Sequence, residues 1–169
     1  MAQLHAYKDK FPKVKDNALL FPSAEITGDV EIGEKTIIGA GVKIIGDSHG
    51  PVRIGNNVQI LENSVLHLLP DNELHIEDDV IIGPGCMIHG CHIGSGTVVE
   101  PGAIVCDHSR VGRNCVVRAG SVVKQRSLFP DQVVLEGFPA KMDDSAGGVL
   151  SRPSWRLSYE AVARLIRDK

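Results

Sequence analysis

The sequence predicts an all-β fold, a parallel β-helix of about five coils followed by a short C-terminal α-helix. Three observations lead to this prediction: aliphatic side chains recur every six residues, aromatic residues are few, and glycine is abundant. A six-residue period matches neither an α-helix nor an alternating strand, and it is typical of hexapeptide β-helices. In such a fold each hexad forms a short strand and a turn, and three hexads close one triangular coil.

The repeat is most regular from residue 93 to residue 123, where consecutive aliphatic anchors keep one register. A small or β-branched residue stands four positions after most anchors, and we expect both to point inward and to stack in ladders about 4.8 Å apart. A β-sandwich is the competing fold, but sandwiches do not keep one register over six hexads. Sixteen anchors, three to a coil, give about five coils. The anchors are Ile26, Ile32, Ile38, Ile44, Ile54, Ile60, Leu66, Ile76, Ile82, Ile88, Ile93, Val99, Val105, Val111, Val117 and Val123.

The composition supports this fold and narrows the classes of protein. Hydrophobic residues make up 43% of the 169 residues and aromatic residues only 4%, so the apolar content is mainly aliphatic. A net charge of −3 and a pI near 6.1 do not favour a nucleic-acid partner. We expect no membrane association, because no apolar run approaches the ~20 residues of a span. The four cysteines include no CxxC pair, which favours a reduced protein. The N-terminus does not resemble a signal peptide, so we expect a cytoplasmic location.

Four segments are expected along the chain. They are a capping segment at residues 1–25, the repeat helix at 26–127, a closing segment and linker at 128–153, and an α-helix at 154–169. Breaks in the six-residue register at Gly46–Arg53 and His67–His75 predict two loops that protrude from corners of the coil.

The C-terminal segment is predicted to be helical because its apolar residues share one face. Trp155, Tyr159, Val162 and Ile166 recur at helical spacing. A helix with a single apolar stripe needs a surface to cover. We expect that surface to be the outside of the coil or a neighbouring subunit.

Several stretches of the sequence resemble the γ-class carbonic anhydrases, which are trimeric left-handed β-helices. The matching stretches are Ile26-Thr27-Gly28-Asp29-Val30-Glu31-Ile32-Gly33, Gly46-Asp47, Ile54-Gly55, Val65-Leu66-His67, Ile88-His89-Gly90-Cys91 and Gly137-x-Pro139-Ala140-Lys141. The resemblance covers roughly residues 10–141. It implies a left-handed helix, a homotrimer, a small-molecule substrate, and a divalent metal, usually zinc, held by three histidines at the subunit interface.

The resemblance places metal ligands at His67 and His89, but the expected ligand set is incomplete. In the family the ligand from the neighbouring subunit stands five residues before the last one, and that position here is Pro84. Proline offers no side-chain lone pair. Zinc or another divalent metal is therefore expected to be held without a third histidine.

The polar residues around the metal are partly retained. By the same resemblance Asp47 and Glu62 keep their acidic side chains and are the expected catalytic residues. Ile45 stands where the family has an arginine, and Leu61 stands where it has a glutamine. These replacements predict weak or altered CO₂ hydration.

The repeat itself supports a pairing of the two histidines. His67 follows anchor Leu66 and His89 follows anchor Ile88, so both are expected on the same face of successive coils. Three residues remain open as a third donor: Cys106 in the same column, Glu62 of a neighbour, and His92. The alternative is a hydrogen-bonded pair of histidines without metal.

Three classes of function follow. The first is a small-molecule metalloenzyme of lyase or hydrolase type with altered or weak CO₂ hydration. The second is a CoA-dependent hexapeptide acyltransferase in which His67 or His89 acts as general base. The third is a noncatalytic assembly or scaffold subunit, because open β-helix ends expose strand edges that must be capped or paired.

Overall fold

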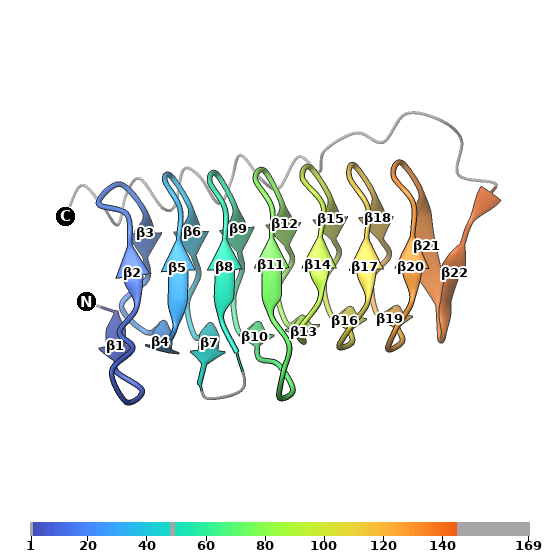
Figure 1. Cartoon of the computed structure of the whole chain (residues 1–169). Coiled ribbons are helices and arrows are strands. Elements are labelled where there is room, and N and C mark those ends of the chain that lie inside the picture. Colours follow the sequence, from blue (N-terminus) through green and yellow to red (C-terminus); the bar gives the residue numbers. More distant parts are fainter. Residues whose placement is uncertain (1, 48–49, 145–169) are drawn as a thin grey trace.

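The computed structural model describes residues 2–47 and 50–144 and shows a parallel β-helix (Figure 1). The predicted all-β coil is confirmed. Three sheets run along the helix, one on each side, and each strand from β1 to β18 pairs in parallel with the strand three places further along the chain. No α-helix occurs in the described residues, and the predicted helix at residues 154–169 lies outside them.

The strands are assigned to sheets I, II and III. Sheet I contains β1 (Gln3–His5), β4 (Glu25–Gly28), β7 (Lys43–Gly46), β10 (Val65–Leu66), β13 (Met87–Ile88), β16 (Ile104–Val105) and β19 (Val122–Val123). Sheet II contains β2 (Lys13–Val14), β5 (Val30–Ile32), β8 (Val52–Ile54), β11 (Leu74–Ile76), β14 (His92–Ile93), β17 (Arg110–Val111) and β20 (Leu128–Phe129). Sheet III contains β3 (Leu19–Leu20), β6 (Ile37–Ile38), β9 (Gln59–Ile60), β12 (Ile81–Ile82), β15 (Val98–Val99), β18 (Val116–Val117), β21 (Val134–Gly137) and the antiparallel β22 (Ala140–Met142).

The core consists of the predicted anchors, stacked in register from coil to coil. Leu66 of β10 lies between Ile44 of β7 and Ile88 of β13, and all three are fully buried. Because successive side chains of a strand point to opposite faces, one residue of each short strand enters the core and its neighbour faces outward. The outward positions are therefore available for a site.

The helix has seven coils, so the expected number of about five was too low. Sheets I and II each contain seven strands. In the first coil Leu4, Val14 and Leu20 occupy the core positions. A loop between Leu4 and Val14 interrupts the six-residue spacing there. In the last coil Phe129 and Leu135 continue the repeat beyond residue 127. A ring at position 129 is accommodated because it stands in the final coil, half-buried at the open end.

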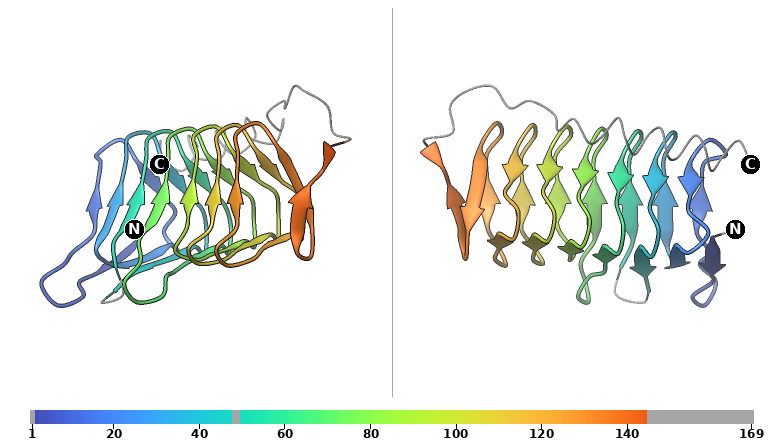
Figure 2. Two further views of the ribbon diagram at one scale, coloured as in Figure 1. Left: turned by 45° about the vertical axis from the view of Figure 1, so that its right-hand side comes forward. Right: turned by 180° about the vertical axis from the view of Figure 1, so that it is seen from behind.

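Loops leave the helix at the corner between sheets I and II, which we call the I–II corner. Strand β7 ends at Gly46 and β8 begins at Val52, while β10 ends at Leu66 and β11 begins at Leu74. Both breaks in the repeat therefore occur where loops were predicted. Figure 2 shows the loops after β1 and β10 extending from the same side of the helix.

Buried hydroxyl groups connect successive coils inside the helix. Thr97 Oγ1 donates to the carbonyl of Gly112 at 2.7 Å and accepts from the amide of Cys115 at 3.0 Å. Thr36 and Ser64 each make the same pair of bonds to the following coil. Each hydroxyl satisfies two backbone groups that the turn leaves without a strand partner, which is why a polar side chain is stable in this core.

Thr97→Val is expected to lower the free energy of unfolding by about 1–3 kcal/mol, because the carbonyl of Gly112 and the amide of Cys115 lose a partner in a buried place. Urea denaturation followed by circular dichroism measures the change. Thr27→Val, at a half-buried outward position of β4, is the matched control and should have little effect. Equal losses in the two variants would contradict the bridging role.

Candidate functional site

His67 and His89 lie side by side at the I–II corner. Strands β10 and β13 pair with Leu66 opposite Ile88, and the His67 amide donates to the Ile88 carbonyl at 3.0 Å. Each histidine is the first residue after its strand, so the two imidazoles occupy the same position on adjacent coils. This is the arrangement predicted from the repeat. The side chains are 35% and 32% exposed, so a small molecule can reach both.

Asp47 approaches the first histidine from the preceding coil. His67 Nε2 lies 3.3 Å from Asp47 Oδ2, and the aspartate side chain is only 22% exposed. Asp47 directly follows β7, as His67 directly follows β10, which explains why the two meet. A carboxylate on one ring nitrogen orients the imidazole and leaves the other nitrogen available.

Asp107 approaches the second histidine from the following coil, and the sequence analysis did not find it. Its Oδ1 lies 3.7 Å from His89 Nδ1, and its Oδ2 accepts from the Leu69 amide at 2.9 Å and from Asn72 Nδ2 at 3.2 Å. Asn72 Nδ2 also donates to the Gly90 carbonyl at 2.7 Å. Asp107 is 3% exposed. It therefore fastens the loop that follows His67 by hydrogen bonds and lies at ion-pair distance from His89.

A signal for Asp107 existed in the repeat. Cys106 was identified as the next member of the histidine column, and Asp107 is the residue after it. Because Asp107 directly follows this column, on the coil after His89, it was a candidate neighbour of His89. The contact with Asn72 had no such signal, because it depends on the path of the loop.

Glu62 and Pro84 do not lie beside the histidines of their own chain. Glu62 precedes β10 and Pro84 precedes β13, at the corner between sheets III and I, while the histidines follow these strands. The two corner residues belong to adjacent coils, since the Gly85 amide donates to the Glu62 carbonyl at 2.8 Å. A shared site with His67 would therefore require a second subunit.

Two of the three residues considered as a third donor, His92 and Cys106, lie in the described part of the same chain near the histidine pair, each with its own surroundings. His92 lies on β14 in sheet II, where its Nε2 is hydrogen-bonded to Glu77 Oε2. Cys106 continues the column beyond His89, but burial and the neighbouring Asp107 raise the pKa of its thiol.

The side chains present fit a divalent metal in part. Within residues 2–47 and 50–144, no group of three or more histidine, cysteine, aspartate or glutamate side chains is arranged to hold a metal ion. His67 and His89 supply two imidazoles. Nε2 of His67 is hydrogen-bonded to Asp47, as is usual for a metal-ligating histidine, whereas Nδ1 of His89 lies 3.7 Å from Asp107, at ion-pair distance. A catalytic zinc site generally has three protein ligands. One chain thus provides two of them.

A second polar cluster occupies the outer face of sheet II. His75 and His92 are opposite each other on β11 and β14, with ring centroids 4.7 Å apart. Glu77 is bonded to His92, accepts from the Ser95 amide at 3.4 Å and lies 3.5 Å from Arg113 Nε. His75 was not among the residues singled out from the sequence. The five-residue step from Ile88 to Ile93 brings these two histidines into register.

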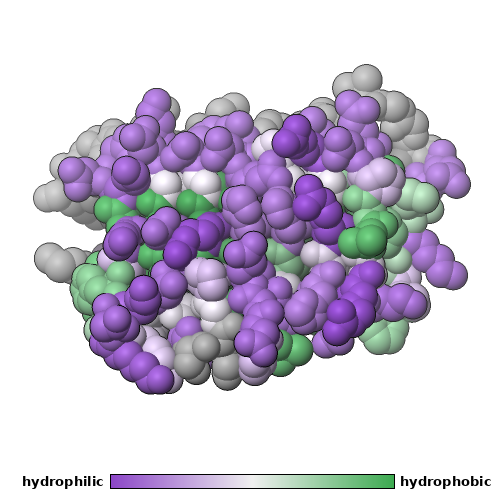
Figure 3. All heavy atoms as spheres, in the orientation of Figure 1, coloured by the Kyte–Doolittle hydropathy of each residue, from purple (hydrophilic) through white to green (hydrophobic). Residues whose placement is uncertain are grey.

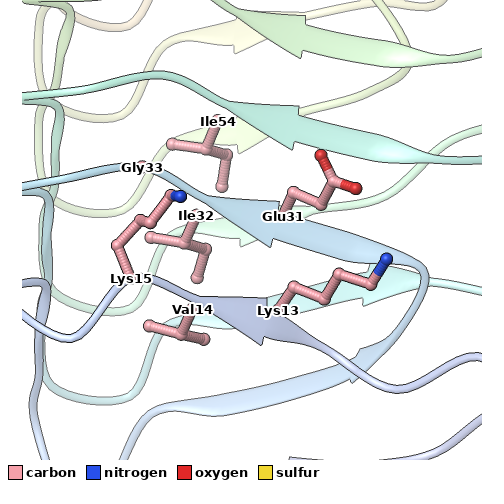
Figure 4. A pocket seen from close by; sticks show the side chains of 7 residues that line it. All are labelled: Lys13, Val14, Lys15, Glu31, Ile32, Gly33 and Ile54. Carbon is pink, nitrogen blue, oxygen red and sulfur yellow. The ribbon is translucent and has the colours of Figure 1, made fainter.

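A shallow groove lies further along the same face. Figure 3 shows that the face is mostly hydrophilic, with hydrophobic surface over β2, β5 and β8. There a groove of about 410 Å³ is lined by Lys13, Val14, Lys15, Glu31, Ile32, Gly33 and Ile54 (Figure 4). Its lining contains no histidine, so the groove and the His67–His89 pair are different surfaces.

Comparison with known proteins agrees with this architecture. The family model for the bacterial transferase hexapeptide (six repeats) matches residues 74–105 and 90–125. The chain is 36% identical over 139 residues to a carbonic anhydrase of Geobacillus kaustophilus, covering 82% of this chain and 76% of that protein. It is 34% identical over 139 residues to the mitochondrial gamma carbonic anhydrase 2 of Arabidopsis thaliana, covering 79% of this chain but only 50% of that protein. A Bacillus cereus crystal structure, described provisionally as an acetyltransferase, superposes with a TM-score of 0.83 at 32% identity, covering 97% and 92% of the two chains.

The coiled fold and the repeat thus define a hexapeptide-repeat protein. The identity and coverage shared with the Geobacillus carbonic anhydrase go further. The chain belongs to the γ-class carbonic anhydrase-like family of left-handed β-helix proteins, as the resemblance indicated.

The cluster on sheet II should make the stability of the fold depend on pH through Glu77. Burial opposes ionisation of Glu77, but the bond to His92, the charge of that ring, the Ser95 amide and Arg113 outweigh it, so its pKa lies below the usual 4.5. A carboxyl group whose pKa is lower in the folded state stabilises above the unfolded pKa and loses this effect as the pH falls.

Glu77→Gln is therefore expected to flatten the dependence of stability on pH below about 4.5. Urea midpoints measured from pH 3 to pH 7 would show it, with the wild type losing stability more steeply on acidification. Glu34→Gln, at an exposed turn, serves as the control. A wild-type slope as shallow as that of the variant would contradict the assignment.

Proposed function

We propose that this chain forms a homotrimer whose His67–His89 pair is a small-molecule metal site with weak or altered CO₂ hydration activity. The observation that carries the proposal is the position of the two imidazoles, adjacent on successive coils and each next to an aspartate. Membership in the family supports a metal there. The absence of a side-chain donor at position 84 supports the reduced activity.

The outer face of sheet I supports a subunit interface beside this site. Met87 is 38% exposed there, and the neighbouring outward residues Val65, Ile104 and Val122 are half-buried. An apolar column of this kind on a water-facing sheet suits contact with another copy. A second subunit there would also bring its own Glu62 and Pro84 toward the histidines, since both stand at the other edge of sheet I.

The residues of this chain would orient the reaction. A divalent metal held by His67 and His89 would supply Lewis acidity, either to polarise a small substrate or to activate water. Asp47 holds the ring of His67 in one orientation through Nε2. Asp107 places a negative charge near His89 and, through the amide of Leu69, fastens the loop that borders the site. Glu62 of a neighbouring subunit would supply the acidic group at the other side.

A reducing, cytoplasmic location is part of the proposal. All four cysteines are free thiols. Burial raises the pKa of Cys86 to about 11 and raises that of Cys115 as well, because both point into the coil. Such thiols pack as small apolar groups and do not need a disulfide partner.

Restoring the missing imidazole is the sharpest test. Pro84→His is expected to raise zinc affinity by at least about 10–100-fold, because even a residue that only hydrogen-bonds to a metal ligand contributes that much. The molar ratio of bound zinc to chain, measured by elemental analysis after dialysis, should rise from below one toward one. CO₂ hydration, measured by stopped flow, should rise with it.

Matched variants identify the site. His67→Ala and His89→Ala should each remove the gain in a Pro84→His background, whereas His75→Ala, on sheet II, should leave it. A Pro84→His protein that gains neither zinc nor activity, although it remains folded and trimeric, would overturn the proposal. Full zinc occupancy and fast CO₂ hydration in the wild type would overturn the claim of reduced activity.

A second candidate is acyl transfer from a CoA thioester. It is favoured by the superposition with the Bacillus cereus structure over nearly the whole chain. His67 beside Asp47 has the form of a histidine general base oriented by a carboxylate, and such a pair needs no metal.

The two candidates predict opposite responses to ligands. If the chain is a metal-dependent enzyme, zinc raises Tm in a thermal-shift assay and acetyl-CoA does not. If it is an acyltransferase, acetyl-CoA raises Tm without zinc, and His67→Ala keeps this stabilisation but loses acyl transfer. A response to neither ligand would favour the assembly role.

A further inference from the structure

A second pair of histidines stands on the outer face of sheet II. His75 of β11 and His92 of β14 are opposite each other on adjacent coils, and these two strands lie side by side in Figure 1. Their imidazole centroids are 4.7 Å apart, with the ring planes inclined by 55°. Both side chains point outward, because the next residue of each strand is an isoleucine buried in the core, and both residues are half-buried. Two imidazoles are therefore held close together where a small ion can reach them.

Hydrogen bonds fix the ring of His92 in one orientation. Its Nε2 is bonded to Glu77 Oε2, and Glu77 in turn accepts from the Ser95 amide and lies 3.5 Å from Arg113 Nε. A neutral His92 that donates from Nε2 keeps a lone pair on Nδ1. Histidines that bind metals usually have this form, with a carboxylate on one ring nitrogen and the metal on the other.

The spacing of the two rings matches two neighbouring ligands of one metal ion. The distance from a zinc ion to an imidazole nitrogen is about 2.0–2.1 Å. Two rings that bind one ion at this distance have centroids about 4.5 Å apart for a right-angled arrangement and about 5.2 Å apart for a tetrahedral one. The observed 4.7 Å lies between these values. The strands therefore need not move, and rotation of the side chains is enough to aim both rings at one ion.

We propose that His75 and His92 form a second metal site, which binds a first-row divalent cation that prefers nitrogen ligands, such as Ni²⁺, Cu²⁺ or Zn²⁺. Imidazole suits these ions, whereas Mg²⁺ and Ca²⁺ prefer oxygen ligands. Two protein ligands leave the other coordination positions to water, so the ion exchanges readily. Glu77 is a positioning residue, because it acts through His92. The site does not depend on metal binding at the I–II corner.

The charged residues next to the pair set its affinity for a cation. Arg53 of β8 stands beside the histidine of β11, and its charge is offset by Asp29 at 2.9 Å and Glu31 at 3.3 Å. Arg110 of β17 stands beside the histidine of β14 and is exposed, so its charge opposes a bound cation. Removal of the Arg110 charge should therefore strengthen binding, and added salt should reduce this effect.

A metal ion held by this pair joins two successive coils. An ion that binds the folded chain and not the unfolded one raises Tm. Part of any response to zinc in a thermal-shift assay would then come from sheet II. The part that remains in a His75→Ala variant belongs to the His67–His89 pair.

Calorimetric titration with NiCl₂ tests the proposal on the full-length protein without a purification tag. The His67→Ala/His89→Ala double variant is the background, so that the other pair cannot hold the metal. We expect this protein to bind one Ni²⁺ per chain in a saturable manner. Adding His75→Ala or His92→Ala should weaken the binding by at least about 10-fold, since even a residue that only hydrogen-bonds to a metal ligand contributes that much.

Three further variants in the same background separate ligation from a general effect on the fold. Glu77→Gln, which leaves both imidazoles in place, should weaken Ni²⁺ binding by about 10-fold. Arg110→Gln should strengthen it about two- to threefold at low salt, and less at high salt. His5→Ala, at an exposed position of β1, is the matched control and should change nothing. Circular dichroism checks that each variant keeps the coil.

The results either support or overturn the second site. Absence of saturable Ni²⁺ binding in the background protein would overturn it, as would equal affinity with and without the two histidines of sheet II. If an alanine variant does not fold, His75→Gln and His92→Gln replace the alanine variants, because they keep the bulk of the side chain. The pair at the I–II corner is missing from every protein of the series, so failure here leaves the proposed function untouched.

Discussion

The structure depends on one constraint, the in-register stacking of each coil on the previous one. Parallel strands about 4.8 Å apart require that equivalent residues of successive coils stand directly above one another. Leu66 between Ile44 and Ile88 is one example, and the same holds on all three sides. Because the interior is narrow, the ladders consist of aliphatic and small side chains, and a hydroxyl is tolerated where it joins two backbone groups, as in Thr97.

The same constraint builds the functional corner. A residue that follows an anchor faces outward, so histidines after Leu66 and Ile88 are placed side by side without any loop to position them. Asp47 and Asp107 extend the arrangement on the coils before and after. A rigid helix thus holds two imidazoles at a fixed spacing, while the neighbouring loop, fastened by Asp107, forms the wall of the site. Pro84 lies at the corner between sheets III and I, outside this frame.

The predictions that succeeded follow from periodicity. The all-β coil, the corner loops and the pairing of His67 with His89 could all be predicted, because a residue's place in the hexad determines its direction and its neighbours. The number of coils was underestimated because the first coil has Leu4, Val14 and Leu20 at uneven spacing. In the last coil a phenylalanine occupies an anchor position, which a search for aliphatic anchors passes over.

The sequence by itself determined the coil, the direction of each side chain and the residue types at the functional corner, because all three follow from local spacing. Tertiary structure alone decided which groups meet across coils and loops. Asp107 joins His89 to the loop through Leu69 and Asn72, and His75 meets His92 because one coil is shorter by a residue. These contacts join residues distant in the chain, and their existence depends on loop paths and packed surfaces that no repeat encodes.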